Sequence, residues 1–449
     1  MTDAESLLDG LDPEQRAVAT ALRGPVRVLA GAGTGKTRAI THRIAYGVAT
    51  GIYVPSAVLA VTFTTRAAGE MRSRLRVLDT PSVQVRTFHA AALRQARYFW
   101  PQVFGGELPE LMSSKIPILA EAASRCRVPS DQALLRDLAG EVEWAKVSNV
   151  VPDDYARLAQ QAGRTPSGID HATAGRVFST YEQVKRDRGR IDMEDVLLCA
   201  AAILTEDERV AAAIRRQYKW FVVDEFQDVS PIQVALLDLW LGGRDDVCVV
   251  GDPMQTIYSF AGASADFLTG FPRKHPGTQA IELVRNYRST PQVVDVANKV
   301  AHARRGSATR VKAVLLKAQR ASGPAVTFGG HANELDEAAD VAEQIARLRE
   351  QGVSPRDVAV LFRINAQSEA YEEALTSRGI PYVVRGVERF FERPEVKQAV
   401  VLLRDEVLGH RHHRLQRLPA VALCPRTRGC LRLPSHARQH AHRVGDQVS

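Results

Sequence analysis

The fold of this chain is decided by one stretch of sequence, Gly31-Ala32-Gly33-Thr34-Gly35-Lys36-Thr37. Its Gly-Lys-Thr ending is that of the phosphate-binding loop G-x-x-x-x-G-K-[ST], which joins a buried strand to a helix. The apolar residues 26–30 predict that strand, and residues 38–46 predict the helix. Glycine lets backbone N–H groups turn inward around phosphate oxygens at the start of a helix. An ordinary glycine turn is the alternative, but such a turn does not need glycine, lysine and threonine together.

This loop supplies most of the predicted nucleotide site. Lys36 is expected to reach the β- and γ-phosphates, and the Thr37 hydroxyl is expected to bind Mg²⁺. The nucleotide-binding residues predicted in this segment are Ala30, Gly31, Ala32, Gly33, Thr34, Gly35, Lys36, Thr37 and Arg38.

Four further apolar runs resemble buried strands, and polar residues follow each of them. They span residues 58–63, 220–223, 247–250 and 281–284. Apolar runs of this length, separated by helical segments, are typical of a parallel sheet buried on both faces. Ligands of such sheets lie at the carboxyl ends of the strands, where these polar residues fall.

Two other regions depart from this pattern. Between residues 90 and 190 the sequence is helix-rich and has no convincing buried strand, which predicts an all-helical insertion into the sheet. Further on, residues 326–328, 358–362 and 383–384 predict short strands of about half of a second α/β domain. Between the first two of these runs the apolar face of a helix is formed by Leu335, Ala338, Ala342, Ile345 and Leu348.

An acidic segment, Asp224-Glu225-Phe226-Gln227-Asp228, follows the apolar residues 220–223. We predict that Asp224 is a second anchor for Mg²⁺ and that Glu225 orients or deprotonates the attacking water. The alternative is an acidic turn on the surface. The phosphate-binding loop earlier in the chain favours the catalytic interpretation.

Two later segments add groups that face a γ-phosphate. Gln255 follows the apolar residues 247–250 and is predicted to sense the γ-phosphate. Arg288 is predicted to neutralise transition-state charge as an arginine finger, and Tyr287 is predicted to stack on adenine. The alternative for Arg288 is a structural role, in which it caps a strand or pairs with an acid.

Together these segments resemble the UvrD/PcrA/Rep group of superfamily 1 DNA helicases. The resemblance covers residues 8–404, and the motifs that carry it are Gln15, the phosphate-binding loop, Thr62-Phe63-Thr64, Thr87-Phe88-His89, the acidic segment, Gly251-Asp252 with Gln255, Asn286-Tyr287-Arg288-Ser289, Asn365-Ala366-Gln367-Ser368 and Phe390-Phe391-Glu392-Arg393. This combination of motifs in this order is highly specific.

The resemblance implies a first RecA-like motor domain, a P-loop NTPase fold, formed by residues 1–88 and 190–280. A helical accessory insertion spans residues 89–189, and an incomplete second RecA-like domain spans residues 281–385. Residues 386–404 begin a second accessory subdomain.

The resemblance also implies roles for individual residues. Gln15 would read the adenine edge, and ATP with Mg²⁺ would be the cofactors. The implied DNA-contacting residues are Phe63, Thr64, Arg66, Thr87, His89, Tyr258 and Phe260. Aromatic rings grip single strands by stacking, whatever the base. Each ring, taken alone, is more often a core residue.

The net charge of +8 comes from the end of the chain. Residues 410–449 contain eight arginines and one acid, whereas residues 1–409 carry 51 basic and 50 acidic residues. The tail at 405–449 is also rich in histidine and is expected to be unstructured. It has three interpretations: a basic DNA-binding arm, a His/Cys metal site, or the out-of-frame end of a truncated helicase, which we favour.

We therefore expect an ATP-dependent 3′-to-5′ DNA helicase and translocase of DNA repair, acting on single-stranded DNA and on junctions between single and double strands. The alternative is a truncated ATP- and DNA-binding fragment that does not unwind. Five scattered cysteines and a polar N-terminus predict a cytoplasmic protein without a membrane segment. The sequence does not indicate protein partners or an oligomeric state.

Overall fold

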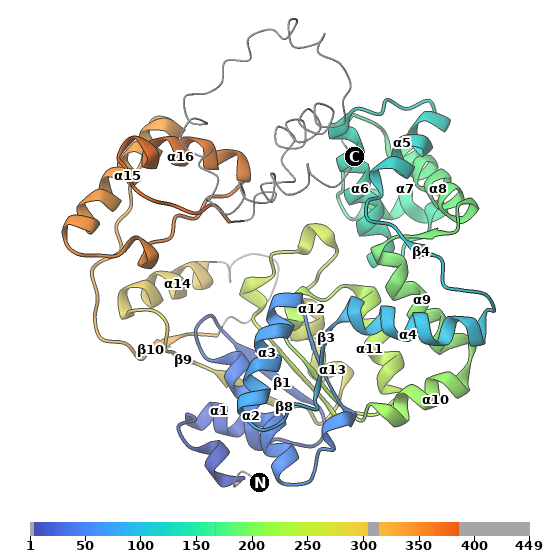
Figure 1. The fold of residues 1–449 in the computed structure, drawn as a ribbon, viewed down its shortest axis with the longest axis horizontal. Helices are drawn as coiled ribbons and strands as arrows, with labels where there is room; N and C mark the ends of the chain where they lie inside the picture. The colour runs from blue at the N-terminus through green and yellow to red at the C-terminus, as the bar shows by residue number, and fades with distance from the viewer. Residues whose placement is uncertain (1–3, 167, 304–313, 386–449) are drawn as a thin grey trace, which may run out of the picture. The chain divides into compact units, whose positions relative to one another are not determined.

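The computed structural model describes residues 4–166, 168–303 and 314–385 (Figure 1). The chain divides into two units, residues 1–327 and 328–449, which are described separately below. The subdomain predicted at 386–404 and the tail predicted at 405–449 lie outside the described residues.

Unit 1 is built around a six-stranded parallel sheet with the order β3-β2-β6-β7-β1-β8. Its strands are β1 (Val26–Ala30), β2 (Val58–Thr62), β3 (Gln84–Thr87), β6 (Trp220–Val223), β7 (Val247–Gly251) and β8 (Gln279–Leu283). The four apolar runs are thereby confirmed as β2, β6, β7 and β8, and residues 26–30 are confirmed as β1. The edge strand β3 was not predicted. The predicted domain boundary at 280/281 lies inside β8, which pairs with β1.

Both faces of this sheet are covered by helices. Successive residues of a strand point to opposite sides, and strands that are apolar at every residue therefore need a covering layer on each face. Val28 packs into one hydrophobic core with helices α1 (Pro13–Thr20), α2 (Lys36–Ala49) and α3 (Thr65–Val77). Its neighbour Leu29 packs into the other core. The helices of that second face are α4 (Phe88–Val103), α9 (Met193–Glu206), α10 (Glu208–Gln217) and α11 (Pro231–Leu241).

Four helices form a separate body, here called the helical insertion: α5 (Ile116–Arg125), α6 (Gln132–Val147), α7 (Pro152–Gln161) and α8 (His171–Asp187). They have their own core around Leu119, Leu138 and Tyr181. The predicted insertion began one helix too early, because α4 packs into the core of the sheet. The chain leaves for the insertion and returns from it through two short paired strands, β4 (Glu110–Leu111) and β5 (Arg190–Ile191).

A buried ionic cluster ties the insertion to α9. Lys146 of α6 lies 2.6 Å from Asp192, the residue that caps α9. Lys185 of α8 lies 2.6 Å from Asp195 and 2.7 Å from Glu182. Burial alone would raise the pKa of Asp192, but the two ammonium groups outweigh it and hold that pKa well below its ordinary value. The lysines thus occupy the space between three carboxylates, where a cation would otherwise be required.

The rest of unit 1 continues from β8 into β9 (Arg285–Asn286), α14 (Pro291–Ala303) and β10 (Lys317–Ala318), where β9 and β10 pair in parallel. Among the described residues of unit 1, the remaining short helices are α12 (Asp266–Thr269), α13 (Phe271–Lys274), η1 (Glu5–Leu8), η2 (Pro55–Ala57), η3 (Phe226–Asp228), η4 (Pro253–Gln255) and η5 (Ser259–Ala261). No helix in the described part of the chain is both long and apolar enough to cross a membrane.

Unit 2 contains α15 (Glu334–Glu350), α16 (Ser368–Ser377) and the short helices η7 (Pro355–Asp357) and η8 (Asn365–Gln367). Ala342 and Ile345 of the predicted apolar face pack against Leu375 of α16. Leu335 of that face is exposed.

The strands predicted at 326–328, 358–362 and 383–384 are wrong: these residues belong to no strand in the described structure. A strand needs a hydrogen-bonded neighbour, and none lies beside them among residues 314–385. Phe328 and Leu361 are consequently 85% and 92% exposed.

Candidate active site

The phosphate-binding loop is shaped by two glycines with positive φ. Gly33 has φ +74° and Gly35 has φ +79°, in the region that side chains disfavour. A Cβ atom on Gly33 would lie 2.7 Å from the Cβ of Arg288, and one on Gly35 would lie 2.5 Å from the Nε2 of Gln15. Both positions therefore require glycine, for conformation and for space.

The first position of the G-x-x-x-x-G-K-[ST] pattern is Ala30, so this chain departs from the full pattern there. Ala30 is the last residue of β1 and is fully buried, an ordinary strand position that accepts a methyl group. Inside the loop the buried Thr34 donates its hydroxyl to the carbonyl of Gly31 at 2.8 Å. The loop is thus held by its own hydrogen bond.

Gln15 lies directly against this loop. Asp12 caps α1 by accepting the N–H of Gln15 at 2.7 Å, and the Gln15 side chain donates from Nε2 to the Thr34 carbonyl at 3.0 Å. The Gln15 side chain is buried. Arg38 is exposed and donates to the Gly10 carbonyl at 3.0 Å.

Lys36 joins the loop to the acidic segment. Its Nζ lies 3.0 Å from Oε2 of Glu225, across 189 residues of sequence. Glu225 has φ +51°, a left-handed conformation that is uncommon for a residue with a side chain and that costs about 1–3 kcal/mol. Conformations of this kind gather at functional sites, where the surrounding structure enforces them.

Asp224 is a buried carboxylate directly after β6. Burial, and next the charge of Glu225, raise the pKa of Asp224 to about 6, against the opposing effect of Lys36. One oxygen accepts the N–H of Glu225 at 3.0 Å. A buried carboxylate in this state favours a divalent cation, which prefers oxygen ligands. The residues present therefore fit Mg²⁺, with the Thr37 hydroxyl on the first turn of α2 as the second predicted ligand.

Gln227, to which no role was assigned from sequence, is the centre of a hydrogen-bond network. Its Nε2 donates to Oε2 of Glu225 and to Oδ2 of Asp228, both at 3.0 Å. Its Oε1 accepts the N–H of Asp252 at 3.0 Å. The side chain is 1% exposed, and a Cβ atom on Gly251 would lie 2.4 Å from its Oε1. The network links the ends of β6 and β7.

The same network reaches Gln255 and the segment beyond it. Gln255 donates from Nε2 to Oδ2 of Asp252 at 2.7 Å. Asp228 accepts the backbone N–H of Ile257 at 3.2 Å. Burial raises the pKa of Asp228 despite this hydrogen bond.

Asn286 closes over the phosphate-binding loop and is a second residue whose role the sequence did not reveal. Its Nδ2 donates to the Ala32 carbonyl at 2.6 Å, and its Oδ1 accepts the N–H groups of Arg288 and Ser289 at 3.0 and 2.7 Å. The N–H of Tyr287 donates to the Gly33 carbonyl at 2.9 Å. The segment after β8 is thereby fixed on top of the loop.

Tyr287 and Arg288 both present exposed side chains beside this loop. The Tyr287 hydroxyl donates to Oδ2 of Asp12 at 2.7 Å. Burial, and next that hydrogen bond, raise the pKa of Tyr287 to about 12. The structure therefore brings together at one edge of the sheet Gln15, the loop, Asp224, Glu225, Gln255, Tyr287 and Arg288.

Three of the predicted DNA-contacting residues form an aromatic row beyond the ends of β2 and β7. The rings of Phe63 and Tyr258 stack with their centroids 4.6 Å apart, and Tyr258 lies 6.2 Å from Phe260. Phe260 is 68% exposed. Phe63 is also exposed and Tyr258 is half-buried, so the row lies at the surface rather than in a core.

The other predicted DNA-contacting residues have local partners. Thr64 and Thr87 cap α3 and α4, each accepting a backbone N–H at 3.1 Å. Arg66 is exposed and pairs with Glu70 at 3.0 Å. His89 lies on the first turn of α4, where burial lowers its pKa.

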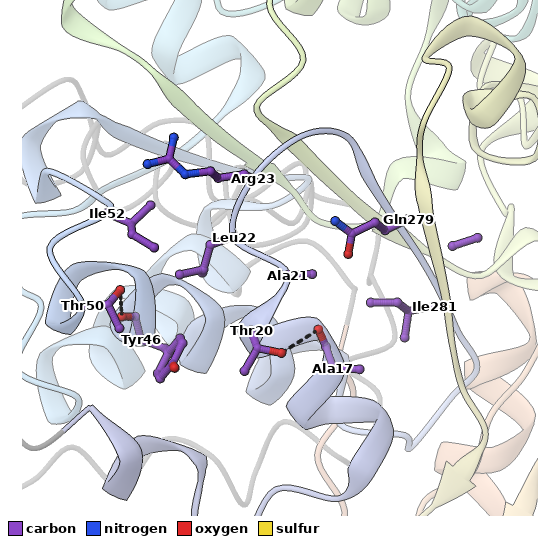
Figure 2. A pocket seen from close by; sticks show the side chains of 11 residues that line it. Ala17, Thr20, Ala21, Leu22, Arg23, Tyr46, Thr50, Ile52, Gln279 and Ile281 are labelled. Atoms are coloured by element: carbon purple, nitrogen blue, oxygen red, sulfur yellow. Dashed lines mark hydrogen bonds between the residues drawn. The ribbon is translucent and has the colours of Figure 1, made fainter.

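A surface hollow of about 800 Å³ lies elsewhere in unit 1, between the end of α1, the end of α2 and the beginning of β8 (Figure 2). Tyr46, Thr50 and Gln279 are among its lining residues. Gln279 pairs with Val26, the first residue of β1, whereas the phosphate-binding loop follows the last residue of β1. The hollow is therefore at the opposite ends of these strands from the nucleotide site.

Comparison with known families agrees with this geometry. Residues 11–276 match the UvrD/REP helicase N-terminal domain, and residues 281–423 match the UvrD-like helicase C-terminal domain. The chain is 51% identical over 412 residues to ATP-dependent DNA helicase UvrD2 of Mycobacterium tuberculosis, which covers 89% of this chain and 58% of that protein.

Two further relatives are more distant. The chain is 32% identical over 451 residues to DNA helicase II of Escherichia coli, covering 97% of this chain and 60% of that protein. It is 30% identical over 399 residues to ATP-dependent DNA helicase PcrA of Leuconostoc citreum, covering 87% of this chain and 52% of that protein. The chain thus spans between about half and three fifths of the length of these relatives.

Proposed function

The chain belongs to the UvrD/REP helicase family with a RecA-like P-loop fold, and from this premise we propose that it is an ATP-dependent DNA helicase and translocase, which moves 3′-to-5′ along single-stranded DNA and acts in DNA repair. Its proposed substrates are ATP, single-stranded DNA and junctions of single- and double-stranded DNA. Because the relatives named above are bacterial DNA helicases, we also propose a cytoplasmic location, where bacterial chromosomal DNA lies.

One observation carries the proposal: Lys36 of the phosphate-binding loop lies 3.0 Å from Glu225 at the end of β6. This contact brings a phosphate-binding cation and a candidate base to the same point. Phosphate oxygens would compete with Glu225 for the Lys36 ammonium. Once Lys36 is released, Oε2 of Glu225 keeps the hydrogen bond from Gln227, which orients the carboxylate. Its other lone pair can then accept a proton from the attacking water.

Asp224 and Thr37 are the residues that would hold Mg²⁺. The bound cation neutralises charge that develops on the phosphate oxygens. Gln255 and Arg288 are proposed to contact the γ-phosphate, and Gln15 and Tyr287 to contact the adenine. The hydrogen bond that holds Gln255 on Asp252 gives it a defined position.

The aromatic row is proposed as the grip on DNA. Stacking of one base on an aromatic side chain contributes about 1–3 kcal/mol. The Gln227 network supports coupling between hydrolysis and this grip, because Asp228 contacts both Gln227 and the backbone of Ile257. A change at Glu225 therefore has a path of hydrogen bonds to the aromatic row.

A second candidate function is ATP and DNA binding without unwinding. It is favoured by the region after β8, where the described residues contain a single ladder of two short strands, β9 and β10. A motor that steps along DNA closes two rigid domains around ATP. The described residues after β8 do not form a second parallel sheet of this kind, which favours binding without stepping.

Strand displacement measured beside DNA-stimulated ATP hydrolysis separates the two candidates. A duplex with a 3′ single-stranded tail should be unwound, and one with a 5′ tail should not. Unwinding of the 5′-tailed duplex alone would refute the direction. ATP and DNA binding without displacement of either strand would establish the second candidate.

A further inference from the structure

Phe260 lies on a short turn whose large apolar side chains are exposed and are not packed against the sheet. The turn consists of residues 257–263, here called the aromatic segment, and includes η5. Inside it, the N–H groups of Ala261 and Ala263 donate to the Tyr258 carbonyl at 3.0 and 3.2 Å, and the N–H of Gly262 donates to the Ser259 carbonyl at 3.1 Å. Ile257 and Phe260 are 67% and 68% exposed, so burial of their side chains contributes little to the position of the segment.

One attachment of the aromatic segment is to the nucleotide site. Asp228 accepts the N–H of Ile257 at 3.2 Å, and Phe63 stacks on Tyr258. These contacts fix the beginning of the segment to the ends of β6 and β2, but they do not touch Phe260.

The N–H of Ser264, the residue after the segment, also donates to the Val229 carbonyl at 3.3 Å. A further attachment, at Phe260 itself, comes from the helical insertion. Arg164, which follows α7, donates from Nη1 to the carbonyl oxygen of Phe260 at 3.1 Å, across 96 residues of sequence. Two residues after Phe260, Gly262 has φ +86°, and a Cβ atom there would lie 2.7 Å from Cγ2 of Val147 on α6. The segment therefore comes close against the insertion at the residues around Phe260.

The Arg164 side chain is itself rigidly placed. Glu141 of α6 accepts from Nε at 2.9 Å and from Nη2 at 2.8 Å, a two-pronged ion pair. The guanidinium lies over the ring of Trp144, 4.7 Å from its centroid. The Tyr155 hydroxyl donates to the same carboxylate at 2.6 Å. Two of the guanidinium nitrogens are thus committed to Glu141, and Nη1 is left pointing at the Phe260 carbonyl.

We infer that Arg164 is a positioning residue for the DNA grip: it holds the Phe260 turn on the helical insertion, so that the orientation of the insertion sets how Phe260 meets a base. The role rests on the proposed function, since it gives the aromatic segment a DNA ligand. It also explains how the helical insertion, which lies outside the six-stranded sheet, takes part in DNA binding without contacting the nucleotide.

The test is the substitution Arg164→Lys. A lysine retains the positive charge beside Glu141, but a single ammonium group cannot reproduce the planar fork that serves Glu141 and the Phe260 carbonyl together. The matched control is Arg157→Lys on α7, because Arg157 forms an exposed ion pair with Asp154 at 2.6 Å within the same insertion.

Two measurements are made on the full chain. Hydrogen exchange should become faster at the amides of Ala261, Gly262 and Ala263 in Arg164→Lys and stay unchanged in the control. The affinity for a fluorescent single-stranded oligonucleotide should fall about three- to tenfold, the range expected for one lost hydrogen bond. ATP affinity without DNA should not change.

A double-mutant cycle with Phe260→Ala distinguishes positioning from general destabilisation. If Arg164 acts through Phe260, Arg164→Lys should cause no further loss of DNA affinity in the Phe260→Ala background. Additive losses in the cycle, or unchanged hydrogen exchange at residues 261–263, would overturn the inference.

Failure of the proposed function has a different signature. It would appear as an absence of oligonucleotide binding by the wild-type chain. In that case the grip assigned to Phe260 is wrong as well, and exchange alone still reports whether Arg164 holds the turn.

Discussion

Asn286 donates a hydrogen bond to the carbonyl oxygen of Ala32 at 2.6 Å, although 254 residues separate them. The loop after β1 is thereby closed by the segment that follows the edge strand β8. The same amide accepts two N–H groups of its own segment, so it joins the loop and the Tyr287–Arg288 pair into one unit.

Asn286→Ala should loosen this closure and weaken ATP binding by about two- to tenfold, as expected for a lost hydrogen bond. Titration with a fluorescent ATP analogue measures the effect. Asn333→Ala is the control, because it removes the cap of α15 in unit 2 and should leave nucleotide affinity unchanged. Equal losses in the two variants would contradict the role of Asn286.

Glu225→Gln should separate binding from hydrolysis. Without a general base the rate of ATP hydrolysis should fall by about 10²–10⁴-fold. ATP affinity should stay the same or increase, since Lys36 no longer pairs with a carboxylate. Single-turnover hydrolysis and equilibrium binding measure the two quantities. Glu208→Gln, in an exposed pair with Arg215, should change neither.

Lys146→Met should destabilise the helical insertion by about 3–5 kcal/mol, the usual effect of removing one partner from a buried ion pair. Three carboxylates would then share Lys185. Hydrogen exchange at the amides of α6 and α8, measured at a series of denaturant concentrations, reports the loss. Lys299→Met, in an exposed pair with Asp295, should cost about 0–1 kcal/mol. Equal effects of the two substitutions would rule out the cluster as a stabilising element.

The ionic cluster also predicts a pH dependence. The pKa of Asp192 in the folded chain is lowered from its ordinary value of 3.8, so the unfolded chain binds a proton more readily. The stability contributed by Asp192 is therefore complete above about pH 5 and is lost as the pH falls below 3.8 toward the lowered value. Wild type and Asp192→Asn, unfolded at a series of pH values, should differ most near neutrality and converge in acid. A constant difference would show that Asp192 acts without its charge.

The buried strands could be predicted because a parallel sheet covered on both faces leaves a direct trace in the sequence. β2 and β7 are buried at every residue, so each is a continuous apolar run. β3 escaped prediction because it is a short edge strand in which Val85 is the one buried residue. Residues 358–362 have a similar apolar run without a neighbouring strand, and apolar character alone cannot supply that neighbour.

In the site, too, residues within short motifs could be recognised from the sequence, whereas residues that act through contacts far along the chain could not. Roles for Lys36 and Asp224 could be predicted because each residue lies in a short motif with a known chemical purpose. The roles of Gln227, Asn286 and Arg164 arise from hydrogen bonds to residues 25, 254 and 96 positions away. Nothing in the residues next to them indicates which carbonyl or N–H group they meet in space.

The paired strands β4 and β5 have a consequence for how this architecture can change. The N–H of Glu110 bonds to the Gly189 carbonyl, and the N–H of Met112 bonds to the Ile191 carbonyl, at 3.1 and 2.8 Å. The chain thus enters and leaves the helical insertion at almost the same place, because the paired strands β4 and β5 lie about 4.8 Å apart. A linker of a few residues would therefore span the gap left by the four-helix body. A replacement body would have to supply the cations that Asp192 and Asp195, at the start of α9, meet in Lys146 and Lys185.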